Sequence, residues 1–346
     1  MTRTVLFHEL GGPEVLTSAD VEVGEPGPGE VRIRVDAIGV NRAEALFRSG
    51  HYIEPVKRFP ARLGTEAAGV VEAVGADVTG LAPGQPVSTV PAFSQNDYGV
   101  YAEQAIVPAA AVLRRPEGFG PVEGAAVWMP YVTAYGALVE VGGMRPGDTV
   151  VLNAASSSVG LAAIHVANRI GATPIALTRT AAKRDALLKE GAAQVIVTGP
   201  EAGPGSGAAS GAGSSDVVER VLAATGGRGA EFVFDAVAGP GVTDLARLTA
   251  PEGLHLVYGF LSGEPTPYPA LDLGMPPVAM RTYLLFETTT HPDRLRRAEA
   301  FISAGLRSGD FRPVVDRTFA LNEVVDAHRY LESNAQVGKI VVTVPR

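Results

Sequence analysis

The sequence predicts an α/β protein that combines a doubly wound parallel sheet with a separate β-rich domain. Residues 1–125 contain many short apolar runs separated by Pro-Gly and Gly-Pro pairs, a pattern typical of short strands and turns. From about residue 127 onward, helical segments alternate with apolar strands, which indicates a parallel sheet. Residues 153–160 form a turn of small residues between one such strand and the helix after it.

Length and charge limit the classes of protein to which the chain can belong. It has 346 residues, of which 46% are hydrophobic, and a formal net charge of -8 at pH 7. Because single cores seldom grow beyond about 250–300 residues, we expect two domains. The acidic balance provides no overall basic field, so nucleic acid is not expected as a primary partner.

The absence of cysteine excludes further kinds of chemistry. With 0 cysteines, the chain can form no disulfide, thiolate nucleophile or cysteine-ligated zinc site. The N-terminal residues lack a long apolar region, and no run of about 18 apolar residues occurs anywhere. We therefore expect a cytoplasmic protein with no membrane partner.

The elements of each domain follow from alternation and punctuation. In the β-rich domain, strands are predicted at residues 30–37, 67–74 and 87–90, with turns at 26–29 and 83–84. In the second domain, strands are predicted at 150–152, 174–177, 195–197, 232–234, 254–257 and 282–286.

The C-terminal elements are expected to return to the first domain. They comprise a helix at 292–308, a strand at 314–319, a helix at 322–331 and a last strand at 339–344. One segment, residues 199–215, is rich in Gly, Ala and Ser and has almost nothing to pack. We predict that it is a mobile surface insertion.

The turn at residues 153–160 has the spacing of a dinucleotide cradle. Small residues stand at Ala154, Ser157 and Gly160, where a strand-to-helix turn brings backbone N–H groups and the helix N-terminus against a pyrophosphate. Since Ala and Ser replace two of the usual glycines, the pattern also fits an ordinary strand-helix turn.

The end of the next strand indicates which dinucleotide would bind. It carries Thr178 and Arg179, with Lys183 opening the following helix, and no acidic residue. An Asp or Glu there would bind the ribose 2'-hydroxyl of NAD, whereas nearby cations favour the 2'-phosphate of NADPH. These residues therefore favour NADPH, the alternative being that the cations only form the solvated face of a helix.

Five short motifs in one order resemble the medium-chain dehydrogenase/reductase superfamily, in particular its zinc-independent quinone oxidoreductase branch. They span residues 37–41, 48–52, 64–71, 146–150 and 338–341, so the resemblance covers nearly the whole chain. It implies a Rossmann-type dinucleotide-binding domain at 127–287. It also implies a GroES-like catalytic domain formed by 1–126 and 288–346.

The same resemblance implies that no zinc is bound. Zinc-dependent relatives carry a Cys near residues 39–41 and a His after the Gly of a Gly-x-Glu motif, where this chain has Thr65. Glu66 remains, but one carboxylate does not make a catalytic zinc site, which needs about three protein ligands. The six histidines are scattered without metal-ligand spacing.

Carried over residue by residue, the resemblance implies a cofactor site. Asn41 and Thr133 would lie near the nicotinamide, and Phe260 and Ser262 would flank its ribose. The 2'-phosphate would contact Thr178, Arg179 and Lys183. The pyrophosphate would lie on Ala155, Ser156, Ser157, Ser158, Val159 and Gly160.

Without a metal, the expected reaction is hydride transfer from NADPH to a quinone or an α,β-unsaturated carbonyl, with Asn41 and Tyr52 as the catalytic side chains. Tyr52 would donate a hydrogen bond or proton, or else form a wall of the pocket. Two alternatives stay open: a biosynthetic reductase of enoyl thioesters, and an NADPH-binding redox sensor without turnover. Through the superfamily's use of its last Rossmann strand, here 282–286, a homodimer is expected.

Overall fold

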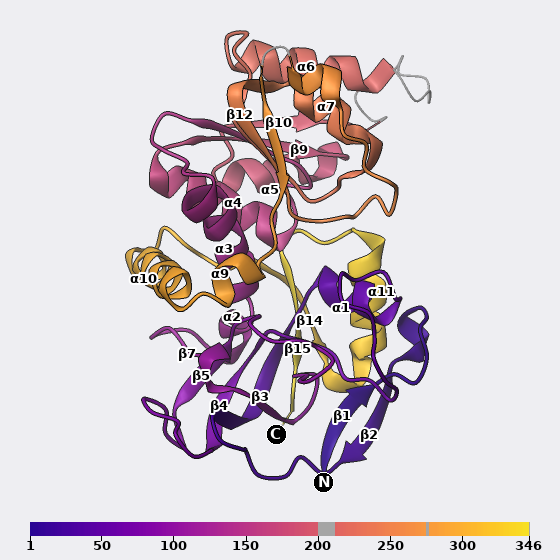
Figure 1. Ribbon diagram of the computed structural model, residues 1–346, viewed down its shortest axis with the longest axis vertical. Coiled ribbons are helices and arrows are strands. Elements are labelled where there is room, and N and C mark those ends of the chain that lie inside the picture. The colour runs from indigo at the N-terminus through magenta and orange to yellow at the C-terminus, as the bar shows by residue number, and fades with distance from the viewer. Residues whose placement is uncertain (200–211, 275–276, 346) are drawn as a thin grey trace. The chain divides into compact units, whose positions relative to one another are not determined.

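The chain forms two compact units in this computed structural model, which describes residues 1–199, 212–274 and 277–345 (Figure 1). The first unit contains Met1–Met129 and Pro313–Arg346, and the second contains Pro130–Arg312. An α/β fold with one parallel sheet and one β-rich unit, as predicted, is confirmed.

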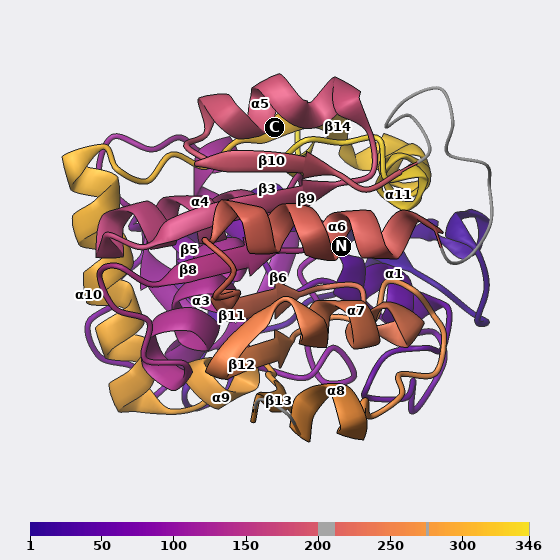
Figure 2. The same ribbon diagram turned by 90° about the horizontal axis from the view of Figure 1, so that it is seen from above.

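The second unit is built on a six-stranded parallel sheet with the strand order β10-β9-β8-β11-β12-β13 (Figure 2). From β8 the chain moves outward in one direction to β10, then returns to β11 and moves outward in the other direction. Since crossovers between parallel strands are right-handed, the helices of the two halves cover opposite faces. The strands are β8 (Thr149–Leu152), β9 (Thr173–Thr178), β10 (Gln194–Val197), β11 (Ala230–Asp235), β12 (Thr249–Val257) and β13 (Ala279–Thr282).

Helices connect and flank these strands. The described ones are α3 (Trp128–Tyr135), α4 (Ser158–Ile170), α5 (Arg184–Lys189), α6 (Ala212–Ala224), α7 (Val242–Arg247), α8 (Ala270–Gly274), α9 (Phe286–Thr289) and α10 (Pro292–Ser308). A π-helix, Gly136–Val141, continues α3. No helix within the described residues is long and apolar enough to cross a membrane.

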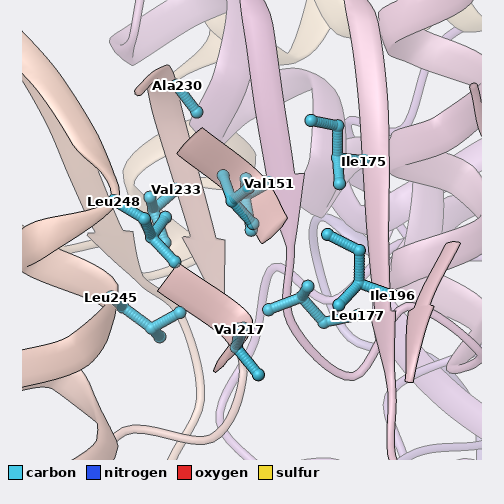
Figure 3. Close-up of a cluster of buried hydrophobic side chains, with 10 residues drawn as sticks. Val151, Ile175, Leu177, Ile196, Val217, Ala230, Val233, Leu245 and Leu248 are labelled. Atoms are coloured by element: carbon cyan, nitrogen blue, oxygen red, sulfur yellow. The ribbon is translucent and has the colours of Figure 1, made fainter. Parts of the chain in front are cut away.

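A buried hydrophobic cluster fixes α6 and α7 to the sheet (Figure 3). Val217 of α6 and Leu245 of α7 lie in one cluster with strand residues such as Val233. The remaining members are Val151, Ile175, Leu177, Ile196, Val221, Ala230 and Leu248. β-branched and aliphatic side chains buried between sheet and helices explain why these strands read as short continuous apolar runs.

The first unit contains a seven-stranded sheet that is mostly antiparallel. The strand order is β14-β15-β3-β4-β5-β7, with β6 also paired to β3, and β1 and β2 form a separate hairpin. The strands are β1 (Thr2–Leu6), β2 (Thr17–Val21), β3 (Glu30–Val40), β4 (Ala67–Val74), β5 (Pro86–Thr89), β6 (Gln104–Pro108), β7 (Val112–Arg114), β14 (Val315–Ala320) and β15 (Lys339–Thr343). The helices are α1 (Arg42–Arg48), α2 (Pro121–Gly124) and α11 (Val324–Ser333).

One predicted strand was wrong. The last parallel strand is β13, Ala279–Thr282, and not residues 282–286, because the chain turns after Thr282 and α9 begins at Phe286. The backbone N–H of Leu284 donates to Glu287 Oε1 at 3.2 Å, and the hydroxyls of Tyr283 and Thr288 lie 2.9 Å apart. These local bonds stabilise the turn although its apolar residues are typical of a strand.

The compact units differ from the predicted domain boundaries at one point. The chain passes from the first unit to the second between Met129 and Pro130, close to the predicted residue 127. It returns to the first unit at Pro313 and not at residue 288. The reason is α10, which packs within the second unit: the ring of Phe301 lies 4.9 Å from Tyr135 and 5.7 Å from Phe311. Of the predicted insertion, residues 200–211 lie outside the described part, and α6 begins at Ala212.

Candidate functional site

The turn after β8 is fixed by hydrogen bonds from both of its ends. Asn153 Oδ1 accepts from the backbone N–H of Ala154 at 2.9 Å, and its Nδ2 donates to Asp235 Oδ1 at 2.9 Å. Ser157 caps α4, accepting from the N–H of Gly160 at 3.1 Å. A Cβ on Gly160 would lie 2.4 Å from the carbonyl oxygen of Ala155, so the turn requires glycine there.

This turn lies at the switch point of the parallel sheet. β8 and β11 are neighbours, and the chain leaves them in opposite directions. Asp235, at the end of β11, also accepts from the N–H groups of Val237 at 2.8 Å and Ala238 at 3.1 Å. Open parallel sheets bind ligands outside the carboxyl ends of their strands at such a point, so Ala155, Ser156, Ser157, Ser158, Val159 and Gly160 lie where a pyrophosphate binds in such sheets.

Ala154 has a backbone conformation that normally requires glycine. Its φ is 51°, in the left-handed region where a Cβ is unfavourable. The hydrogen bond to Asn153 Oδ1 holds its backbone N–H in this conformation. The turn therefore has, at a residue other than glycine, a backbone conformation that favours glycine.

A lysine from the next helix region reaches this turn. Lys183 Nζ donates to Ser156 Oγ at 3.2 Å, which brings a cation beside the turn after β8. Arg179 is exposed at the end of β9, whereas Thr178 is buried and its hydroxyl lies 3.4 Å from the carbonyl of Thr180. Of the three residues predicted for the 2'-phosphate, Arg179 is thus exposed and Lys183 contacts the turn, whereas Thr178 is buried.

The other predicted cofactor residues of the second unit lie on a loop and on α3. Phe260 is 42% exposed, and the N–H of Ser262 donates to the carbonyl of Val237 at 3.0 Å. The loop after β12 is therefore joined to the loop after β11, at the same edge of the sheet as the turn. Thr133 is buried on α3.

In the first unit, Asn41 is the centre of a buried polar network. Its backbone N–H donates to Glu44 Oε2 at 2.7 Å, and its Oδ1 accepts from Lys339 Nζ. Its Nδ2 lies 3.0 Å from the carbonyl of Gly39 and 3.4 Å from Glu66 Oε2. Both N–H donors of the carboxamide are therefore used within the protein.

The two carboxylates of this network have different surroundings. Glu44 is fully buried, and burial raises its pKa to about 7, an effect that the nearby charge of Lys339 opposes. Its Oε1 accepts from the hydroxyl of Thr65 at 3.3 Å. Glu66 is also fully buried, and its Oε1 accepts from the backbone N–H of Met129 at 2.8 Å.

Tyr52 has a hydroxyl that is available to a ligand. The side chain is half-buried, and its ring packs edge-on against Phe47 at 6.2 Å. Burial, and then the charges of Glu44 and Glu54, raise the pKa of Tyr52 to about 12. No hydrogen bond of its hydroxyl occurs among the described residues, so a protonated donor remains free at neutral pH.

In each unit, residues that hold the candidate side chains were not found from the sequence. Asn153 and Asp235 hold the turn, and Glu44 and Lys339 hold Asn41. The spacing Asn-x-x-Glu is a capping-box pattern that predicts the Asn41 and Glu44 pair. Within the described residues, no group of three His, Cys, Asp or Glu side chains is arranged to hold a metal ion.

Comparison with known proteins defines the family of the chain. Residues 27–117 match the family model of the alcohol dehydrogenase GroES-like domain, and residues 210–342 match that of zinc-binding dehydrogenases. The chain belongs to the medium-chain dehydrogenase/reductase superfamily. It shares this membership with proteins named as quinone oxidoreductases and a haloacrylate reductase.

The quinone oxidoreductase of Pseudomonas aeruginosa is 30% identical over 99% of this chain and 99% of its own length. The 2-haloacrylate reductase of a Burkholderia species is 29% identical over 99% of both chains. Among solved structures, Escherichia coli quinone oxidoreductase complexed with NADPH superposes with a TM-score of 0.88 at 28% identity, covering 99% of this chain and 100% of that one.

Proposed function

We propose that the chain is an NADPH-dependent reductase that transfers a hydride to a quinone or an α,β-unsaturated carbonyl and needs no zinc. The observation that carries the proposal is the turn after β8, with Lys183 Nζ 3.2 Å from Ser156 Oγ. A cation at that place, beside a strand end without an acid, favours a phosphorylated ribose. The E. coli relative solved with NADPH supports the same cofactor.

The residues of the second unit fit this cofactor. The turn at Ala155 to Gly160 would hold the pyrophosphate through backbone N–H groups and the N-terminus of α4. Arg179 and Lys183 would contact the 2'-phosphate together with Thr178, and Phe260 and Ser262 would flank the nicotinamide ribose. Thr133 would lie near the nicotinamide. When bound, NADPH supplies the hydride.

The first unit would act on the acceptor. As hydride reaches a conjugated carbon, negative charge develops on the carbonyl oxygen, and a hydrogen-bond donor there lowers the barrier. Tyr52 would be that donor, because its hydroxyl is free and its pKa is about 12. Asn41 would line the reacting centre, but its carboxamide N–H groups already donate to Gly39 and Glu66.

The absence of zinc is part of the proposal. Asn41 and Thr65 are poor zinc ligands, and the ammonium of Lys339 lies against Glu66, one of the two carboxylates there. A divalent cation would be repelled at that position. An acceptor that is already activated by conjugation needs no Lewis acid, and the 2-haloacrylate reductase among the relatives is named for a substrate of this conjugated class.

The first experiment is a binding and turnover assay with the purified protein. NADPH and NADH are titrated, and the nicotinamide absorbance is then followed with quinones, enones and an enoyl thioester. Selective NADPH binding with turnover of quinones or enones supports the proposal, and a clear preference for the thioester would favour the biosynthetic alternative. Binding without turnover of any acceptor would favour a sensor.

We also propose a homodimer in which β13 is the contact strand. β13 is one of the two edge strands of the six-stranded sheet, and an exposed edge would invite uncontrolled pairing unless another strand covers it. The N–H of Tyr283 donates inward to Val257 of β12 at 2.8 Å, so that of Thr282 faces the open edge. Sedimentation at micromolar concentration should give a dimer that Thr282→Pro weakens, because proline cannot donate to a strand ladder. A stable monomer would contradict this arrangement.

A further inference from the structure

Lys339 is a charged residue placed where three strands of the first unit meet. β3 and β15 are antiparallel, and Ile340 lies opposite Val40. The residue before Ile340, Lys339, therefore lies opposite the residue after Val40, which is Asn41. On the other side of β3, the N–H of Gly39 donates to the carbonyl of Glu66 at 2.9 Å, just before β4 begins. The ends of β3, β4 and β15 therefore bring Asn41, Glu66 and Lys339 together.

The lysine is buried and paired in this position. Its side chain is 2% exposed, and Nζ lies 2.5 Å from Glu66 Oε2, which is fully buried. Nζ also donates to Asn41 Oδ1. A Cβ on Gly39 would lie 2.1 Å from the carbonyl oxygen of Ala125, 2.7 Å from Glu66 Oε2 and 2.9 Å from Lys339 Cε, so the absence of a side chain at residue 39 makes room for that carbonyl and for the pair.

These contacts determine how the Asn41 carboxamide is turned. An ammonium is only a donor, so the atom of Asn41 that faces Lys339 must be the oxygen. The nitrogen then faces the carbonyl of Gly39 and the carboxylate of Glu66, which are acceptors. If the ammonium were absent, the oxygen would lose the donor Lys339, and the carboxamide would be held only from its nitrogen side, by Gly39 and Glu66.

We propose that Lys339 is a positioning residue of the reductase, which holds the Asn41 carboxamide in one orientation while it pairs with Glu66. This inference rests on the proposed function, in which Asn41 lines the reacting centre. Lys339 touches neither cofactor nor acceptor in this role. It acts through Asn41, and its loss lowers kcat rather than cofactor binding.

The competing explanation is that the buried ion pair only stabilises the fold. Lys339→Met alone leaves Glu66 buried without its partner and should lower the melting temperature. The double variant Lys339→Met with Glu66→Gln removes both charges at similar volume and should recover most of that loss. Lys189→Met, at an exposed position of α5, is the matched control and should behave as the parent.

The kinetic result separates the two explanations. In the double variant, kcat should stay about 10- to 100-fold below the parent because the carboxamide is no longer held, while KM for NADPH changes less than about twofold. In an Asn41→Ala background, the same two substitutions should cause no further loss. A double variant with the parent kcat, or losses that multiply in the Asn41→Ala background, would overturn the positioning role.

A second measurement does not depend on turnover. With the protein labelled with ¹⁵N at asparagine side chains, the signals that disappear in Asn41→Ala identify the Asn41 carboxamide. In the parent its two protons should be well separated and exchange slowly with water, and in the double variant they should exchange faster. Unchanged signals would overturn the inference. If the parent reduces no acceptor, the proposed function fails, and this measurement still decides whether Lys339 orients Asn41.

Discussion

At the scale of single residues, Tyr52 and Asn41 have different capacities although both were predicted to act on the substrate. The carboxamide N–H groups of Asn41 already donate to Gly39 and Glu66. The hydroxyl of Tyr52, in contrast, makes no hydrogen bond among the described residues. The donor to a developing oxyanion is therefore expected to be Tyr52. In the proposed function, Asn41 would contribute only its shape and the remaining acceptor capacity of its oxygen.

Tyr52→Phe should lower kcat about 100-fold with little change in NADPH affinity, since it removes one hydrogen-bond donor to the charge that develops in the transition state. The raised pKa, about 12, means that the hydroxyl stays almost fully protonated up to about pH 10. The Tyr52 contribution should thus persist from pH 7 to pH 10. Steady-state kinetics on the two proteins measures both effects, and equal kcat values would leave Tyr52 as a pocket wall.

Glu44 should make stability depend on pH. Its pKa in the folded protein, about 7, is above the ordinary value of 4.5, so the folded state binds the proton more tightly than the unfolded state. The contribution of protonated Glu44 to the free energy of unfolding is therefore complete below about pH 4.5 and is lost as the pH rises through 7. Glu44→Gln should remove this dependence, and melting temperatures of both proteins between pH 4.5 and 8 test it. Parallel curves would contradict the raised pKa.

Ala154→Gly should increase the free energy of unfolding by up to about 1 kcal/mol, because the left-handed conformation is unfavourable for a residue with a Cβ. The gain is limited by the greater freedom of glycine in the unfolded chain. NADPH affinity should not fall, since the backbone shape of the turn is kept. Denaturant unfolding and an NADPH titration measure these quantities, and a loss of stability above 1 kcal/mol would show that the strain is not present.

At the scale of elements, the candidate residues of each unit lie at a place where strand ends converge. In the second unit, the ends of β8 and β11 join through Asn153 and Asp235, and the next strand, β9, leads to Arg179 and Lys183. In the first unit, the ends of β3, β4 and β15 join through Asn41, Glu66 and Lys339. Each place combines a regular framework with a few buried polar side chains.

The double variant Arg179→Ala with Lys183→Ala should weaken NADPH binding about 10- to 100-fold, because charge-assisted hydrogen bonds contribute about 1.5–3 kcal/mol. NADH lacks the 2'-phosphate, so its affinity should change by less than about threefold. Fluorescence titration of both cofactors measures the difference. An equal loss for NADPH and NADH would show that these cations do not read the 2'-phosphate.

At the scale of the whole molecule, helices and strands with a clear periodic pattern could be predicted from the sequence. The side-chain contacts that connect these elements could not. The helix at 292–308 was predicted with its bounds, since a proline at its first position and Gly309 after its end mark it clearly. The strand at 67–74 was predicted equally well. The segment 282–286 failed because its apolar residues carry no sign of the Leu284 and Glu287 bond that turns the chain.

The polar networks of the site join residues that are distant in the sequence. Lys339 and Asn41 meet only because β15 pairs with β3, and Asn153 meets Asp235 only because β11 lies beside β8. Local propensity contains no information on such pairs. The turn at 153–160 was recognised as a candidate cradle from its small residues, but the conformation of Ala154 could not be predicted from them.

The most direct test of the central claim follows the hydride itself. The protein is incubated with NADPH carrying deuterium at both C4 positions of the nicotinamide and with an α,β-unsaturated ketone, and the product is analysed by mass spectrometry and NMR. The account predicts a saturated ketone with one deuterium at its β-carbon, formed equally well after treatment with a zinc chelator. A product without deuterium at that carbon, or no reduction of any quinone or enone tested, would contradict it.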